Sequence, residues 1–324
     1  MSTTRRAWDK GVDALRHQRC GRETRKLGQP SETSKYAGQI IRLVAPRRLS
    51  VGRSGVGRFC SILRGLPFAL CCTVVSAVWL LPASSLHGQS PAADDFRPIV
   101  GGNYPMVHAL AVQADGSVLM GGWFPTIGEA VRANLARLHA DGTLDPVFNP
   151  GANEIVHCFV VQGDGRIVVG GAFSQLAGYA RHAVARLNVD GTLDFWFNPL
   201  VGGPGSAVCS ALVEQPDGKL VVGGLFTSLG GQPHSNLGRL EADGTVDASF
   251  AADTDGVVVS LTFAPDGKIL VGGDFRVVAG QPRTNLARLN ADGTLDSEFN
   301  PGANRPVQAL AIQADGKILV GGSF

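Results

Sequence analysis

Residues 107–151 read VHALAVQADGSVLMGGWFPTIGEAVRANLARLHADGTLDPVFNPG, and this stretch decides the fold because the chain repeats it. An Asp-Gly pair, followed by a β-rich run and a Gly-Gly pair, recurs at spacings of 49, 53, 49 and 49 residues, with its glycines at Gly116, Gly165, Gly218, Gly267 and Gly316. A second Asp-Gly pair recurs at the same spacings of 49, 53 and 49 residues, with its glycines at Gly142, Gly191, Gly244 and Gly293. Two independent markers with one period indicate an internal structural repeat.

Each unit predicts four short strands and no helix. In the first unit we expect strands over 107–113, 117–120 and 134–139, and a shorter one over 143–148. Each Asp-Gly closes a two-residue hairpin, because Gly adopts positive φ without steric cost. Repetition of four strands favours an all-β propeller of four-stranded blades, about 49 residues per repeat. A β-solenoid is the alternative, but its coils are usually much shorter.

The motifs LAVQADGSVLMGGWF (110–124) and NLARLHADGTLDPVFNPGAN (134–153) resemble the delta-60 repeat, a β-propeller repeat of large exported bacterial proteins. The resemblance covers 94–324, with departures at Val184, Gly238 and Val246 and a four-residue insertion near 202–205. It implies a fold and a cell-surface setting, and no established activity. The unit that ends at Phe324 is incomplete, so we expect a chain truncated at its C-terminus, with further repeats in the intact protein.

Charge and hydropathy divide the chain. Residues 1–64 hold 15 Lys/Arg against 4 Asp/Glu, whereas 65–324 hold 14 against 23. We predict a disordered basic extension over 1–64, or a true start further downstream. Residues 66–81 are apolar, too short for a membrane span of about 20 residues, and follow Arg58 and Arg64. They predict a signal peptide over 65–88, cleaved near Gly88, with an uncleaved anchor as the alternative.

The remaining residues, 89–324, form four full units with partial ones at both ends, and we expect the protein to be secreted or at the cell surface. The acidic repeats argue against nucleic-acid binding. The chain has no catalytic motif of the hydrolase, P-loop or zinc-protease kinds, which predicts a protein that is not an enzyme.

Recurring polar residues favour structural roles. The arginines of the third strand are each expected to pair with a turn carboxylate such as Asp145, because a buried Arg needs a partner; they are Arg137, Arg186, Arg239 and Arg288. His108 and His157 share a repeat position, but Ser210 and Val259 follow there, so we predict no metal site. Cys158 and Cys209 replace Ala and Val of other units and are interpreted as small buried side chains, with a disulfide as the alternative.

Two ligand hypotheses remain. The loops 188–194 and 290–296 place oxygen side chains at alternating positions, which suits calcium; the alternative is a turn whose Asp caps its own backbone, and we expect no cofactor. The loops between the second and third strands share one end of the blade with the joins from one unit to the next, and this end is expected to vary in length and content and to carry binding. One repeat position there predicts a basic arc, Arg132, Arg181, His234 and Arg283, with Trp123 and Tyr179 nearby. The alternative is that each Arg pairs within its own blade.

We therefore expect an exported, non-catalytic repeat scaffold that binds a protein, a polysaccharide or another anionic polymer at a surface, with no membrane span after signal cleavage. The alternatives are a non-catalytic segment of a larger secreted enzyme and a calcium-stiffened structural array.

Overall fold

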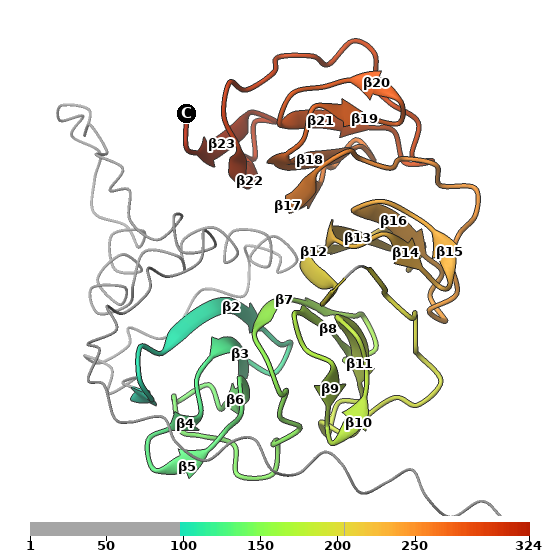
Figure 1. Cartoon of the computed structure of the whole chain (residues 1–324). Coiled ribbons are helices and arrows are strands. Elements are labelled where there is room, and N and C mark those ends of the chain that lie inside the picture. Colours follow the sequence, from blue (N-terminus) through green and yellow to red (C-terminus); the bar gives the residue numbers. More distant parts are fainter. Residues whose placement is uncertain (1–97, 204) are drawn as a thin grey trace, which may run out of the picture. The chain divides into compact units, whose positions relative to one another are not determined.

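The computed structural model describes residues 98–203 and 205–324, and these residues form a series of antiparallel sheets without any helix (Figure 1). The predicted basic extension and signal peptide lie outside the described residues. Four sheets have three long strands, and the sheet at the C-terminal end of the chain has two. The all-β fold of repeated blades that the sequence predicts is confirmed.

Each blade begins with three strands joined in order. The first strands are β2 (Met106–Val112), β7 (Val156–Val161), β12 (Val208–Glu214), β17 (Val257–Phe263) and β22 (Val307–Ile312). The second strands are β3 (Val118–Trp123), β8 (Ile167–Gly171), β13 (Leu220–Leu225), β18 (Ile269–Asp274) and β23 (Ile318–Gly322). The third strands are β6 (Leu135–Leu138), β11 (Val184–Leu187), β16 (Leu237–Leu240) and β21 (Leu286–Leu289).

The fourth strand is shorter than the sequence predicts. In the first blade it pairs through one bridge, Leu138 with Leu144, and then turns away. The reason is Asp145, whose Oδ1 accepts hydrogen bonds from the backbone N–H of Val147 and Phe148 at 2.8 and 3.2 Å. Backbone donors that bond to a side chain are not available to a strand ladder. The same bridge recurs in the next three blades.

The connection between the second and third strands is a short hairpin rather than a variable loop. These hairpins are β4 (Thr126–Ile127) with β5 (Ala130–Val131), β9 (Gln175–Leu176) with β10 (Tyr179–Ala180), β14 (Ser228–Leu229) with β15 (Gln232–Pro233), and β19 (Val277–Val278) with β20 (Gln281–Pro282). Their length is the same in all four blades, so the length variation expected at this end of the blade does not come from these connections. The variation in length lies in the join near 202–205.

The hairpins also link successive units. The segment that leaves the first blade pairs with the hairpin of the second, through the bridge Ala152–Leu176. The strand β1 (Val100–Gly101) pairs with β4 in the equivalent way. Residues 98–105 therefore act as the tail of a preceding unit.

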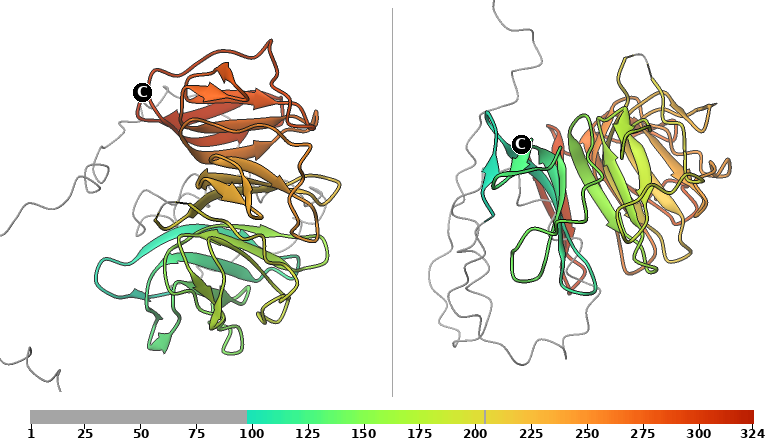
Figure 2. Two further views of the ribbon diagram at one scale, coloured as in Figure 1. Left: turned by 45° about the vertical axis from the view of Figure 1, so that its right-hand side comes forward. Right: turned by 90° about the horizontal axis from the view of Figure 1, so that it is seen from below.

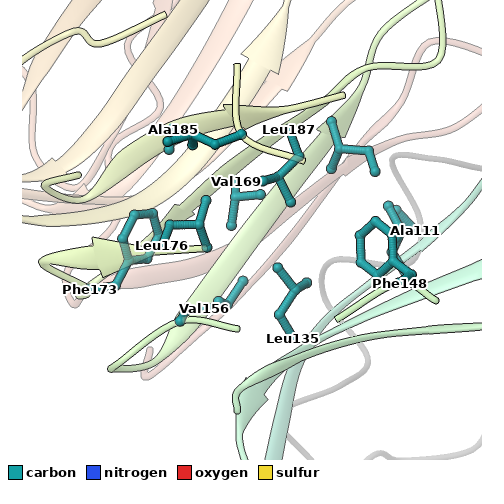
Figure 3. Close-up of a cluster of buried hydrophobic side chains, with 13 residues drawn as sticks. Ala111, Leu135, Phe148, Val156, Val169, Phe173, Leu176, Ala185 and Leu187 are labelled. Atoms are coloured by element: carbon teal, nitrogen blue, oxygen red, sulfur yellow. The ribbon is translucent and has the colours of Figure 1, made fainter. Parts of the chain in front are cut away.

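Neighbouring blades pack face to face through their first and second strands (Figures 1 and 2). Strand β8 is buried along its whole length, which explains the continuous apolar runs in the sequence. Figure 3 shows one core cluster, in which Leu135 and Phe148 of the first blade lie near Val156 and Val169 of the second. The core is thus shared between blades, and no single blade buries its faces alone.

The predicted arginine–carboxylate pairs are confirmed. Arg137 contacts Asp145 at 2.7 Å, and the other three pairs, Arg186–Asp194, Arg239–Asp247 and Arg288–Asp296, are each at 2.8 Å. Each guanidinium also lies over a Phe ring of its own blade, such as Phe148 at 4.4 Å. Arg137 donates a further hydrogen bond to the carbonyl of Val189, in the turn of the next blade. We refer to this arrangement as the arginine latch.

Candidate functional site

The residues of the predicted basic arc lie where each hairpin enters the third strand, but most of their surface is covered. Arg132, Arg181 and Arg283 are only 6%, 8% and 8% exposed. The His234 side chain is 12% exposed, and its Nδ1 lies 3.3 Å from Oδ1 of Asp253. The four positions recur as the sequence predicts, but they do not present an exposed row of positive charge.

The covered arginines hold their own blade together. Arg132 donates from Nη1 to the carbonyl of Val131 at 2.8 Å and from Nη2 to the carbonyl of Asp145 at 3.0 Å. Arg181 does the same with the carbonyls of Ala180 and Phe195. A guanidinium folds inward when backbone carbonyls, which need donors once buried, lie within its reach. This geometry fits the local alternative, whereas ligand binding by these residues stays a prediction.

The two aromatic residues named with the arc are exposed. Trp123 ends β3 and is 39% exposed beside its cross-strand partner Met106. Tyr179 begins β10 and is 50% exposed. They lie on different blades, so they do not form one surface with a repeated geometry.

Tyr179 belongs to a larger cluster that the sequence interpretation missed. Its ring meets the Phe195 ring edge to face, with centroids 4.7 Å apart. The guanidinium of Arg181 lies 5.9 Å from the same Phe195 ring. Phe195 is 55% exposed, and the next residue, Trp196, is 93% exposed. Tyr179, Phe195 and Trp196 are called the aromatic patch below.

The aromatic patch is specific to the second blade. The position of Tyr179 holds smaller or polar residues elsewhere, namely Ala130, Gln232 and Gln281. The positions of Phe195 and Trp196 hold Pro146–Val147, Ala248–Ser249 and Ser297–Glu298. In these four blades the two positions lie between the Asp of the arginine latch and a Phe of the core. The backbone is therefore equivalent, and only the side chains differ. The patch is therefore marked in the sequence by departure from the repeat and not by recurrence.

His108 and His157 lie side by side on the first strands of adjacent blades. Each occupies the extra position of a β-bulge, and their ring centroids are 5.1 Å apart in an edge-to-face contact. Burial lowers the pKa of His108. Burial and the neighbouring His108 lower the pKa of His157 to about 4, so the pair is neutral at pH 7. Within residues 98–203 and 205–324, no three potential metal ligands of the His, Cys, Asp or Glu type come together.

The turn carboxylates considered for calcium are used by their own turns. Oδ1 of Asp190 accepts hydrogen bonds from the backbone N–H of Thr192 at 2.9 Å and from its hydroxyl at 2.7 Å. Asp292 and Thr294 repeat the pattern at the same distances. This is the capped turn that the sequence left open as the alternative.

The described part of the chain contains no helix long and apolar enough to cross a membrane. A family model described as "Domain of unknown function (DUF5122) beta-propeller" matches residues 113–148, 162–194, 215–250, 264–299 and 313–324. No curated protein matches the sequence significantly. The propeller repeat expected from the sequence is confirmed, while the delta-60 assignment stays a prediction.

Solved structures of low identity are similar to the chain. Virginiamycin B lyase from Staphylococcus aureus is 13% identical with a TM-score of 0.42, over 66% of this chain and 62% of the lyase. The WD40 β-propeller domain of Doa1 is 18% identical with a TM-score of 0.47, over 68% and 62%. A gluconolactonase from Xanthomonas campestris is 18% identical with a TM-score of 0.41, over 67% and 69%. The chain thus spans less than two thirds of the length of the first two.

Proposed function

We propose that this chain, a β-propeller repeat protein, is an exported, non-catalytic scaffold that binds a protein or polysaccharide at the cell surface through the aromatic patch of its second blade. The observation that carries the proposal is the patch itself. Three aromatic side chains are exposed at positions where no other blade has an aromatic residue. Aromatic side chains are favoured in binding surfaces because they bury a large area with little conformational freedom to lose.

The surroundings of the patch support a binding role. Arg181 contacts Phe195 twice: it donates a hydrogen bond to the Phe195 carbonyl, and its guanidinium lies over the Phe195 ring. Tyr179 and Phe195 hold each other edge to face, so two of the three rings are fixed before a partner arrives. A preorganised surface loses less entropy on binding than a flexible one. An exposed apolar cluster without such a role would be a liability for solubility.

The export half of the proposal rests on the sequence before Gly88. An apolar segment preceded by arginines and followed by small residues has the order of a secretory signal. A chain that carries a repeated scaffold and a single aromatic surface suits display outside the cell, where attachment to other molecules is the common task of such repeats.

The test replaces the patch with residues that the third blade already accepts. The variant Tyr179→Gln, Phe195→Ala, Trp196→Ser is labelled and added to intact cells of the source organism and to its isolated envelope polysaccharide. We expect the Kd of the variant to be at least tenfold higher than that of the wild type, and its melting midpoint to be unchanged. The matched control, Met106→Val with Trp123→Leu, also takes residues from the third blade and is expected to bind as the wild type does.

Two further measurements identify the class of the partner and show which results would refute the proposal. Binding to cells that is lost after protease treatment indicates a protein partner, whereas binding to the isolated polysaccharide indicates a glycan. Equal binding by the patch variant and the wild type would refute the patch as the binding surface. Retention of the whole chain in the cytoplasm of the source organism would refute export.

A further inference from the structure

Two buried thiols meet at the joint between the second and third blades. Cys158 lies on β7 and Cys209 on β12, the first strands of these adjacent blades, and their Sγ atoms are 3.9 Å apart. Both thiols are buried and free in this structure. From this geometry we propose that Cys158 and Cys209 form a disulfide that locks the two blades together when the exported chain folds in an oxidising compartment.

The pair occupies two different repeat positions that only this joint fills with sulfur. Cys209 stands where the other blades have Val107, Val156, Val258 and Val307. Cys158 stands where the other blades have Ala109, Ala211, Ser260 and Ala309. The packing that brings a first-strand valine of one blade against its neighbour therefore brings Cys209 against Cys158. Replacement at both members of one contacting pair is the pattern that a covalent cross-link requires.

A glycine provides the room for the two sulfur atoms. A Cβ added at Gly170 would lie 2.5 Å from the Cys158 Sγ and 2.7 Å from the Cys209 Sγ. At the equivalent glycines of other blades, such as Gly223, the added Cβ would meet the valine of the next blade. The sulfur atoms thus face the same small space, and the 3.9 Å between them would shorten to about 2.05 Å in the bonded form.

Residues 89–324 of the sequence hold no cysteine besides this pair. The sequence contains six cysteines, and the other four, Cys20, Cys60, Cys71 and Cys72, all precede Gly88. Cleavage near Gly88, which belongs to the proposed function, would remove these four thiols. An even number of thiols that contact each other in a secreted chain favours an intramolecular bond.

The oxidation needs an external disulfide, such as glutathione disulfide or a dithiol oxidoreductase in its disulfide form. One Sγ–Sγ bond forms in the protein, the S–S bond of the donor breaks, and both thiol protons end on the two released donor thiols. Burial raises the pKa of the Cys209 thiol well above its ordinary value, which keeps it from reacting as a thiolate once the blades have packed. The bond therefore forms while the second and third blades assemble.

The experiment uses the full chain with Ser at the four N-terminal cysteine positions. The protein is unfolded, reduced and refolded with either glutathione disulfide or reduced glutathione, then digested without reductant and analysed by mass spectrometry. We expect a cross-linked peptide pair containing Cys158 and Cys209 only after oxidative refolding. The loop enclosed by the bond is about 50 residues, so the melting midpoint of the oxidised form should exceed that of the reduced form by about 10 °C.

Two variants adopt the residues of other blades and serve as controls. Cys209→Val and Cys158→Ala should each fold, lack the cross-link, and melt at the same temperature after both treatments. Quantitative alkylation of both thiols after oxidative refolding would overturn the proposal. A cross-linked form that melts below the reduced form would also overturn it, because the bond would then strain the joint instead of locking it.

Discussion

Asn134 shows how one residue supports the join between blades. It adopts a left-handed backbone (φ 62°), which Asn tolerates better than most residues. Its Oδ1 accepts a hydrogen bond from the N–H of Phe124, and its Nδ2 donates to the carbonyl of Ala152. Asn236 and Asn285 repeat both bonds. The second blade has Ala183 there, with the same backbone (φ 60°) and no side-chain hydrogen bond to offer.

Ala183→Asn should stabilise the protein. By equivalence with the other blades, the new side chain would bond the N–H of Phe173 and the carbonyl of Val201, while easing the left-handed backbone. We expect a gain of about 1 kcal/mol in the free energy of unfolding, measured by urea denaturation. The matched change Asn236→Ala should lose about 1–2 kcal/mol. A loss of stability in Ala183→Asn would mean that the buried site has no space for the amide.

His157 makes stability depend on pH at the scale of one residue. Its pKa in the folded protein is about 4, against 6.5 for an exposed His, so the unfolded chain binds more protons between these values. Stability therefore falls as the pH is lowered from 6.5 toward 4. We expect a lower urea midpoint at pH 5 than at pH 7, and a smaller difference in His157→Gln. An equal difference in the variant would assign the pH dependence to other groups.

At the scale of the structural element, the arginine latch joins the third strand, the following turn and the next blade. The guanidinium of Arg137 is paired with Asp145, stacked on Phe148 and bonded to the carbonyl of Val189. Gly191, from the same turn as Val189, packs on that Phe148 ring, where an added Cβ would be 2.8 Å away. The repeated Asp-Gly-Thr turn is therefore part of the contact between blades as well as a hairpin.

The latch predicts unequal effects of the same substitution in two blades. Within the described residues, Arg137 is the cation that pairs with Asp145, whereas Asp296 pairs with both Arg288 and Lys268. The Lys268 hydrogen bond, against the opposing effect of burial and together with Arg288, lowers the pKa of Asp296 to about 2. Arg137→Ala should therefore lower the free energy of unfolding by about 3 kcal/mol, because it leaves a buried carboxylate without its cation.

Arg288→Ala should have a smaller effect, about 1 kcal/mol, because Lys268 remains and the Arg288 side chain is 25% exposed. Urea denaturation of both variants at pH 7 measures the difference. Equal losses would show that Lys268 and the greater exposure of Arg288 make no difference to the cost of removing the arginine.

The sequence predicts elements well where their pattern is local and repeated. The three long strands and their Asp-Gly turns follow from apolar runs and spacing, and the latch pairs follow from the need of buried Arg for a carboxylate. The fourth strand was predicted too long because the bonds of Asp145 to its own following backbone compete with the ladder. Hairpins such as β9–β10 have two-residue strands and a partner in the previous unit, so no periodicity reveals them.

The candidate site also depends on contacts that form only in the folded chain and that no local sequence pattern predicts. The arc was predicted at the surface because Arg132 and Arg181 recur in a connecting segment, but the carbonyls that draw them inward become neighbours only in the folded blade. Phe195 and Trp196 stand in a segment that otherwise matches the repeat. Their exposure depends on the turn at Asp194, whose Oδ1 accepts a hydrogen bond from the N–H of Trp196. That turn is evident only in the folded structure.

At the scale of the whole molecule, neighbouring blades have equivalent backbones and share their cores. Packing between blades constrains the residue type at buried positions, whereas an exposed position can depart from the repeat without disturbing that packing. The acidic repeat region, with 14 Lys/Arg against 23 Asp/Glu over 65–324, discourages nonspecific binding to anionic polymers. In the proposed function, an uncharged aromatic surface lets one blade bind a partner without a change in the scaffold.

The most direct test of this account moves the patch to another blade. Starting from the variant that lacks the patch, Gln281→Tyr, Ser297→Phe and Glu298→Trp place the three rings on the fourth blade, where Arg283 stands at the position of Arg181. Binding to source-organism cells is measured by titration of the labelled protein. The account predicts that the transplanted protein recovers most of the wild-type affinity. Folded protein that still fails to bind would contradict the claim that the aromatic patch, carried by an otherwise equivalent blade, is the functional surface.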